Sequence, residues 1–109
     1  MRMKSNISGK PAPKRVLVWG GGGHGHVVID LLRTATEPWE IVGIIDNVNP
    51  RGTRILGLPV LGDADQLPTF RNQGVDHIVV AIGDNAARAR MLQYALSLGF
   101  QTPTLIHPT

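Results

Sequence analysis

Cysteine is missing from this sequence, so disulfides and thiolate metal sites are excluded. No apolar run approaches the ~20 residues that a membrane-spanning helix needs. The basic N-terminal stretch also lacks the apolar core of a secretory signal. We therefore expect a cytoplasmic protein that does not bind a membrane.

Positive charge is scarce in most of the chain. Residues 1–15 contain five basic residues and no acid, whereas residues 16–109 contain six arginines, no lysine and eight acids. The basic excess belongs to an N-terminal tail, residues 1–14, whose Ser, Asn, Gly and Pro content predicts disorder. Nucleic-acid binding would need clustered Lys and Arg on the folded part. Residues 15–109 are therefore expected to form one domain that binds no nucleic acid.

Apolar runs alternate with helical patterns along this domain. The clearest runs are apolar throughout, which is typical of a parallel sheet covered on both faces. With right-handed crossovers, the pattern predicts an α/β, Rossmann-like open parallel sheet in the order 3-2-1-4-5, with helices on both faces. The expected strands span 15–19, 39–46, 55–62 (ambiguous, because it contains Gly57 and Pro59), 75–82 and 102–108, and the expected helices span 24–35, 63–74 and 84–98.

Two of the expected helices, the first and the last, have apolar stripes, and the last is followed by a residue pair that is typical of a helix end. The stripes, which should pack on the sheet, consist of Val27, Val28, Leu31 and Leu32 in the first helix and of Leu92, Ala95 and Leu96 in the last. Gly99 followed by Phe100 is typical of a glycine C-cap with its hydrophobic contact.

A glycine-rich loop lies between the first expected strand and the first expected helix. Gly20-x-Gly22-x-x-Gly25 fits the dinucleotide-binding pattern in its required context, and Asp46 follows Gly25 by twenty-one residues. In this pattern Gly20 would permit a tight turn, Gly22 would let a phosphate approach the backbone, and Gly25 would let helix and strand pack closely. The helix N-terminus would then offer free N–H groups to an anion.

Asp46 and the two histidines of the loop refine this prediction. Asp46 is suited to accept hydrogen bonds from a ribose diol, and its charge would repel the 2′-phosphate of NADP. His24 and His26 stand where the helix begins, and either could donate to a phosphate or a sugar hydroxyl. The pair is not expected to bind a metal, because residues two apart on a helix do not face each other. The alternative reading is a glycine turn that only joins strand to helix.

A second group of candidates is Gly83-Asp84-Asn85, at the carboxyl end of the apolar strand 75–82. In open α/β sheets, ligands bind in the crevice beyond the carboxyl ends of the strands. We therefore expect these residues and the glycine loop to line one crevice. Asp84 or Asn85 could instead serve only to cap the following helix. His77 is expected to be a packing residue at a strand end.

Several motifs in order resemble the N-terminal domain of bacterial nucleotide-sugar acyltransferases. These are the sialic acid O-acetyltransferase (NeuD-like) family and its relatives, the UDP-bacillosamine (PglD-like) and GDP-perosamine N-acetyltransferases. The motifs cover residues 15–109 and read WGGGGHGHVVIDLL, GIIDN, GLPVLGD, VVAIGDNAARAR, LGF and LIHPT. The resemblance implies a domain that binds a UDP- or GDP-sugar in the synthesis of surface polysaccharide or glycan.

The resemblance also implies which residues contact the ligand. Gly22, Gly23, His24 and Gly25 would lie against the diphosphate and sugar, and Asp46, Asn47, Gly83 and Asn85 would lie near ribose and base. With Gly20 from the pattern and Asp84 from the second turn, the candidate substrate-binding set is Gly20, Gly22, Gly23, His24, Gly25, Asp46, Asn47, Gly83, Asp84 and Asn85.

Family members continue into a left-handed β-helix that forms a trimer, binds acetyl-CoA and carries the catalytic histidine. No hexapeptide repeat of that kind occurs in this sequence. We therefore expect the chain to bind a nucleotide-sugar without a cofactor or catalytic residue of its own, and to be monomeric or weakly associated. A regulatory module that binds NAD or CoA remains the alternative.

Overall fold

A computed structural model of the chain describes residues 12–105, so the expected tail lies outside the described residues except for 12–14. One sheet of five strands has the order β3-β4-β2-β1-β5. The elements are β1 (Lys14–Trp19), α1 (Gly23–Thr34), β2 (Trp39–Ile45), β3 (Arg54–Ile55), β4 (Leu58–Gly62), the 3-10 helix η1 (Ala64–Gln66), α2 (Leu67–Asn72), β5 (His77–Val80) and α3 (Asn85–Ser97).

The parallel strands confirm the predicted fold class and strand order. The neighbours β4, β2, β1 and β5 are all parallel, and only the two-residue β3 runs antiparallel, against β4. The predicted strands 3, 2, 1 and 4 correspond to β4, β2, β1 and β5. The predicted fifth strand is reduced to a parallel bridge between Gln101 and His77. Residues 102–105 are not a strand as expected, and 106–108 lie outside the described residues. Pro103 explains part of the difference, because it has no N–H to donate to a strand ladder.

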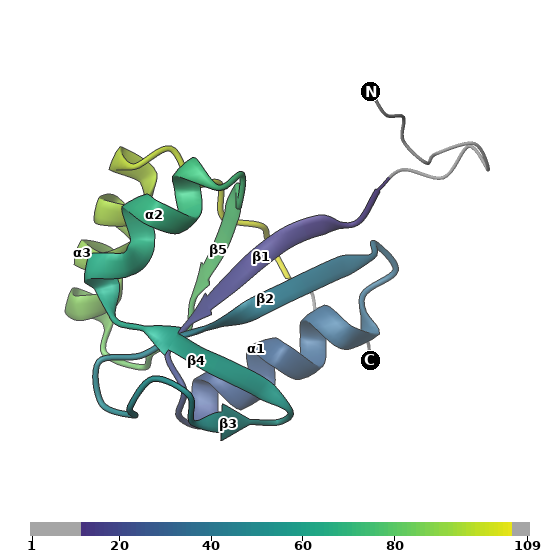
Figure 1. Cartoon of the computed structure of the whole chain (residues 1–109), viewed down its shortest axis with the longest axis horizontal. Helices are drawn as coiled ribbons and strands as arrows, with labels where there is room; N and C mark the ends of the chain where they lie inside the picture. Colours follow the sequence, from purple (N-terminus) through teal and green to yellow (C-terminus); the bar gives the residue numbers. More distant parts are fainter. Residues whose placement is uncertain (1–11, 106–109) are drawn as a thin grey trace.

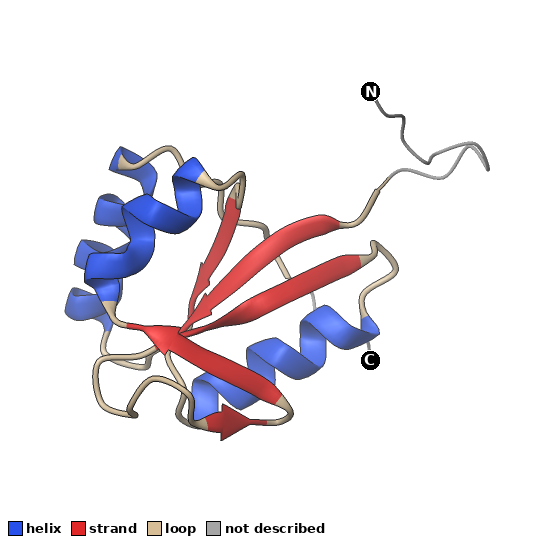
Figure 2. Ribbon diagram, viewed as in Figure 1, coloured by secondary structure: helices blue, strands red, loops and turns tan. Residues whose placement is uncertain are grey.

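Helices cover both faces of this sheet (Figure 2). Because successive side chains of a strand point to opposite faces, β1 contributes to two cores. Leu17 and Trp19 belong to the cluster on the side of α2 and α3, which includes Leu67 and Ala95. Val16 and Val18 belong to the cluster on the side of α1. A sheet buried on both faces explains why the strand sequences are apolar throughout.

The buried face of α1 differs from the expected stripe. Gly25, Ile29 and Leu32 are buried, Val28 packs against them, and Val27 is 55% exposed. The helix is rotated relative to the expectation because Gly25 allows its first turn to approach the backbone of β1. Similarly, Ala95 is the buried residue of α3, whereas Leu96 is half exposed.

The end of α3 has the predicted geometry. Gly99 adopts φ +95, its N–H donates to Leu96 O at 3.0 Å, and Phe100 N–H donates to Ala95 O at 3.2 Å. These two bonds define a Schellman motif. Phe100 is 2% exposed and belongs to the core beside α3.

The ambiguous segment 55–62 forms most of a tight hairpin. Leu56 and Gly57 both have positive φ, of 51 and 81, as in the two-residue turns that match the twist of a hairpin. Arg54 donates to Gly57 O at 2.6 Å across the turn, and Arg33 at the end of α1 donates to Leu56 O at 2.7 Å.

Among residues 12–105, no helix is long and apolar enough to cross a bilayer.

Candidate functional site

The carboxyl ends of β1, β2 and β5 meet at one edge of the sheet (Figure 1). Backbone bonds hold these ends together: Gly20 N–H donates to Ile45 O at 2.8 Å, and Ala81 N–H donates to Trp19 O at 2.8 Å. The glycine loop, Asp46 and the turn at Gly83 follow directly from these three strands. All the predicted site residues therefore lie in the segments that begin at this carboxyl edge.

Two glycines of the loop are required by close packing, as the pattern predicts. Gly20 has φ +128, and a Cβ atom there would overlap the carbonyl oxygen of Ala81. A Cβ at Gly25 would overlap the carbonyl oxygen of Gly20. These contacts bring the first turn of α1 against the end of β1 and fix the direction of the helix N-terminus.

Gly22 and Gly23 differ from these two because they face open space. A Cβ at either position would meet nothing within 4 Å. Gly22 is the N-cap of α1 and offers no side chain to its free N–H groups, and the first turn has no acidic residue. The start of α1 therefore combines unpaired donors, a partial positive charge and room for an anion.

The start of α3 also lies at this edge and lacks a side-chain cap. Asp84 is its N-cap residue, but the Asp84 side chain makes no capping hydrogen bond. The side-chain Oδ1 of Asn85 accepts from Arg88 Nη2 at 2.9 Å. The alternative that these two residues serve only as caps is therefore not supported by their side-chain contacts.

Asp46 is more engaged with the protein than a solvated carboxylate would be. Its Oδ1 accepts from Val48 N–H at 2.9 Å, and its Oδ2 accepts from Asn49 Nδ2 at 2.6 Å. The side chain is partly buried and orders the loop that follows β2, of which Asn47 is an exposed member. Each carboxylate oxygen keeps a further lone pair for a ligand donor.

Gly21 belongs to the candidate site, although the Gly-x-Gly-x-x-Gly spacing does not include it. A Cβ there would overlap Asp46 Oδ2 and lie 2.8 Å from Ile55 Cδ1, so only glycine allows the glycine loop and Asp46 to approach this closely. The signal was the unbroken run of four glycines, which exceeds the requirement of the pattern. Asn49, which holds Asp46, gave no such signal.

The two histidines of the loop have different surroundings. A Cβ at Gly83 would lie 2.9 Å from His24 Cε1, so the His24 imidazole lies against the turn after β5 and links two of the predicted segments. His26 is exposed on α1. His24 thus belongs to the carboxyl edge through a contact of its side chain, and His26 only through its position in the chain.

A cavity of about 510 Å³ lies elsewhere, at the opposite edge of the sheet. It is lined by the first residues of β1, β2 and β5, by the end of α1 with residues 35–37, and by the segment 101–105. None of the predicted site residues lines it. His77, expected to be a packing residue, forms part of its wall.

Comparison with known proteins places the chain in a family. A family model described as the PglD N-terminal domain matches residues 15–95. The chain belongs to this family. Among curated proteins, no sequence matches it.

Solved structures of two acetyltransferases are similar to this chain. One is a variant of perosamine N-acetyltransferase from Caulobacter crescentus in complex with CoA and GDP-perosamine, at 41% identity and a TM-score of 0.78 over 89% of this chain. The other is the acetyltransferase domain of PglB from Neisseria gonorrhoeae in complex with acetyl coenzyme A, at 33% identity and a TM-score of 0.71 over 89% of this chain. The match covers 44% and 45% of those two chains, so this chain spans less than half of their length.

A more distant likeness concerns the fold alone. RSP, a Rex-family repressor, is 19% identical, with a TM-score of 0.64, over 88% of this chain and 49% of the repressor. The same sheet architecture therefore occurs outside the PglD N-terminal domain family.

Proposed function

We propose that this domain binds a nucleotide-sugar, a UDP- or GDP-sugar, at the carboxyl edge of its sheet, as part of a sugar acetyltransferase. Family membership and the similarity to perosamine N-acetyltransferase, whose structure holds GDP-perosamine, support this ligand class. The observation that carries the proposal is the open start of α1 at Gly22 and Gly23, which directly follow Gly21, the residue packed against the Asp46 carboxylate.

The diphosphate would occupy the start of α1. The one lysine of residues 12–105, Lys14, lies at the opposite end of β1. This edge therefore needs another source of positive potential, and the unpaired N–H groups of the first turn of α1 supply it. Gly22 and Gly23 leave the approach free of side chains. The imidazole of His24, against Gly83, could donate to the second phosphate or to the sugar.

The nucleoside would lie toward β2 and β5. Asp46 would accept from the ribose diol through the lone pairs that Val48 and Asn49 leave free, and its charge would disfavour a 2′-phosphate. Asn47 follows β2, whereas Asp84 and Asn85 follow β5, and all three side chains are exposed. In these positions they could contact the base and sugar.

Acetyl transfer would require acetyl-CoA, as the CoA complexes of the two relatives suggest. The described residues supply the nucleotide-sugar half of such a reaction. For the full-length enzyme we further propose acetyl-CoA as the acetyl donor and a trimeric assembly like that of the NeuD-like family. A regulatory NAD- or CoA-binding role is less favoured, because the similarity to a regulator, the Rex-family repressor RSP, rests on the fold alone.

Calorimetric titration with a GDP-sugar, a UDP-sugar, NAD and CoA tests the proposal, using the parent chain and Gly22→Val. The valine side chain would fill the open approach while the extended backbone of Gly22 (φ −86, ψ −154) can accommodate it. We expect at least tenfold weaker nucleotide-sugar binding, with unfolding stability within about 1.5 kcal/mol of the parent. Unchanged affinity would contradict phosphate binding at α1.

A further inference from the structure

The cavity at the amino edge of the sheet is well separated from the carboxyl edge. β1 spans the sheet between the two with six residues, which corresponds to about 20 Å at the usual rise of a strand. The cavity volume of about 510 Å³ falls in the range of roughly 300–1,000 Å³ that is typical of small-molecule sites. A ligand there would not contact the nucleotide-sugar site.

The charges in the cavity wall neutralise each other. Lys14 Nζ lies 2.7 Å from Glu37 Oε2 and 5.9 Å from the centroid of the Trp39 ring. No other Lys, Arg, Asp or Glu of the described residues lines the cavity. The described wall therefore offers no unpaired charged side chain, and a neutral ligand would leave the pair intact.

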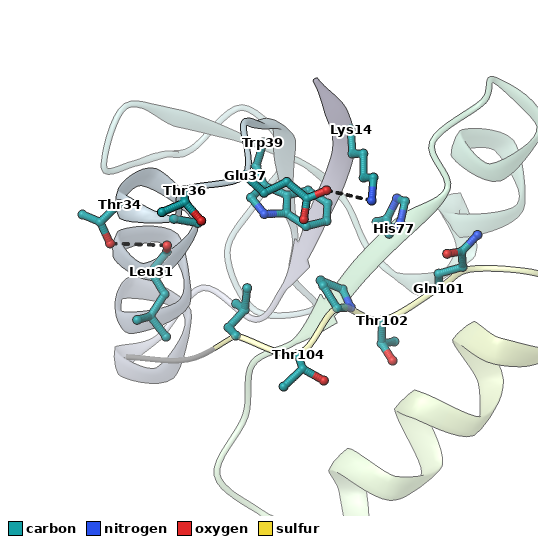
Figure 3. Close-up of a pocket in the computed structure, with 13 residues that line it drawn as sticks. Lys14, Leu31, Thr34, Thr36, Glu37, Trp39, His77, Gln101, Thr102 and Thr104 are labelled. Carbon is teal, nitrogen blue, oxygen red and sulfur yellow. Dashed lines mark hydrogen bonds and ion pairs between the residues drawn. The ribbon is translucent and has the colours of Figure 1, made fainter. Parts of the chain in front are cut away.

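The remaining wall combines an aromatic surface with hydroxyl groups. Trp39 packs edge-to-face on His77, with ring centroids 5.2 Å apart, so the indole is held in one orientation. Figure 3 shows Trp39 and Glu37 on one side of the cavity and Thr102 and Thr104, from the segment after α3, on the other. Within residues 12–105, the Thr36, Thr102 and Thr104 hydroxyls make no hydrogen bond, while the hydroxyl of Thr34 donates to its own helix.

His77 adds a polar atom whose hydrogen bonding is incomplete. Its Nδ1 is buried and has no partner among the described residues. Buried polar atoms are nearly always hydrogen-bonded, so His77 keeps an unused hydrogen-bonding atom in the wall of the cavity.

We propose that this cavity is a second binding site, which takes a neutral polyhydroxylated molecule of monosaccharide size. An apolar face of the sugar ring would pack on Trp39, and its hydroxyls would bond to Thr102, Thr104 and His77. The amphipathic indole is a common platform for ligands with one apolar and one polar side.

The indole N–H resonances of the two tryptophans provide the test. Trp39 lies in the cavity wall, whereas Trp19 is buried in the other core and serves as an internal reference. The ¹⁵N-labelled chain would be titrated with glucose, N-acetylglucosamine and myo-inositol, and separately with acetate, phosphate and choline. We expect a saturable shift of the Trp39 signal with a neutral sugar, at a Kd of about 1–10 mM, and no shift of Trp19.

Two threonine variants separate the site from the general surface. Thr102→Val removes one hydroxyl from the exposed cavity wall, and we expect it to weaken sugar binding about three- to tenfold, as for the loss of one neutral hydrogen bond. Thr69→Val makes the same change on exposed α2, and binding should not change. Equal affinity in Thr102→Val and the parent would overturn the proposal.

Two further outcomes would also overturn it. The absence of a saturable Trp39 shift with every neutral sugar, or an equal shift with acetate and phosphate, would reject the neutral-ligand assignment. Loss of the sugar-induced shift in Gly22→Val would place the sugar at the carboxyl edge instead. Retention of the shift in Gly22→Val supports two separate sites, whatever that variant does to nucleotide-sugar binding.

Discussion

At the scale of single residues, Asp46 combines a structural role with the proposed binding role. Its two oxygens hold Val48 and Asn49, so the loop after β2 keeps its shape through the same carboxylate that would face the ribose. The spacing from the glycine pattern predicted the position of Asp46. It could not reveal the bonds to the loop, because they depend on how residues 46–49 turn after the strand ends.

Asp46 variants can separate the two roles. Asp46→Ala removes both oxygens and the charge, whereas Asp46→Asn keeps an acceptor for Val48 N–H. We expect both to weaken nucleotide-sugar binding by about 1.5–3 kcal/mol, the range for hydrogen bonds to a charged group. Only the alanine variant should lose about 1 kcal/mol or more of unfolding free energy, measured in denaturant. Calorimetry showing equal affinity in the alanine variant and the parent would remove Asp46 from the site.

Gly25 and Gly23 form a matched pair within one helical turn. Gly25→Ala should lower the free energy of unfolding by about 1–3 kcal/mol, because the added methyl overlaps the backbone oxygen of Gly20 and forces α1 away from β1. Gly23→Ala meets open space and gains up to about 1 kcal/mol from helix propensity. Urea unfolding of both variants checks the opposite signs; similar destabilisation by both would argue against this packing.

At the scale of elements, local signals were predictable and the rotation of the helices was not. The end of α3 follows from two adjacent residues, Gly99 and Phe100, whose chemistry is independent of the rest of the fold. Which face of α1 is buried depends instead on the approach of Gly25 to Gly20, a contact between a helix and a strand. Val27, which was expected in the buried stripe, is therefore exposed, and Ile29, which was not named in that stripe, is buried, although the helix itself was located correctly.

The C-cap of α3 gives a prediction at this scale. Gly99→Ala should reduce the free energy of unfolding by about 1–2 kcal/mol, because an alanine rarely adopts the left-handed backbone of this position. Gly99→Asn should cost less, since asparagine tolerates that conformation better. Thermal unfolding of the two variants compares them directly. An alanine variant as stable as the parent would mean that the chain ends α3 equally well without positive φ.

At the scale of the whole molecule, alternation of strands and helices predicted which edge gathers the candidate residues. The strand order places the ends of β1, β2 and β5 side by side, and this follows from general connection rules. The amino-edge cavity was not predictable, because the sequence pattern assigned residues 24–35 to a helix and residues 102–108 to a strand and did not indicate a space between them. The ends of chain segments meet there only through the packing of α1 and α3 on opposite faces.

Ligand-dependent melting tests the binding of the whole domain. A ligand at ten times its Kd should stabilise the fold by about 1.4 kcal/mol, which is a rise in Tm of roughly 5–10 °C for a domain of this size. We expect this rise with a UDP- or GDP-sugar and a smaller one with NAD or CoA. The reason is that the proposed contacts to the diphosphate, the ribose and the sugar all lie at one edge, within residues 12–105, whereas NAD and CoA carry no such sugar. A rise with NAD alone would assign that edge to a different class of nucleotide.

The same 109-residue polypeptide should release no thiol from acetyl-CoA when an amino-sugar nucleotide is added. Acyl transfer needs a general base within hydrogen-bond reach of the acceptor, and the proposed binding mode commits His24 to the ligand. His77 lies at the other edge of the sheet, about 20 Å away by the rise of β1, where it cannot reach the acceptor. A thiol-release assay with the Tm-shifting ligand measures this directly, and release above background would show that these residues already contain an acyl-transfer site.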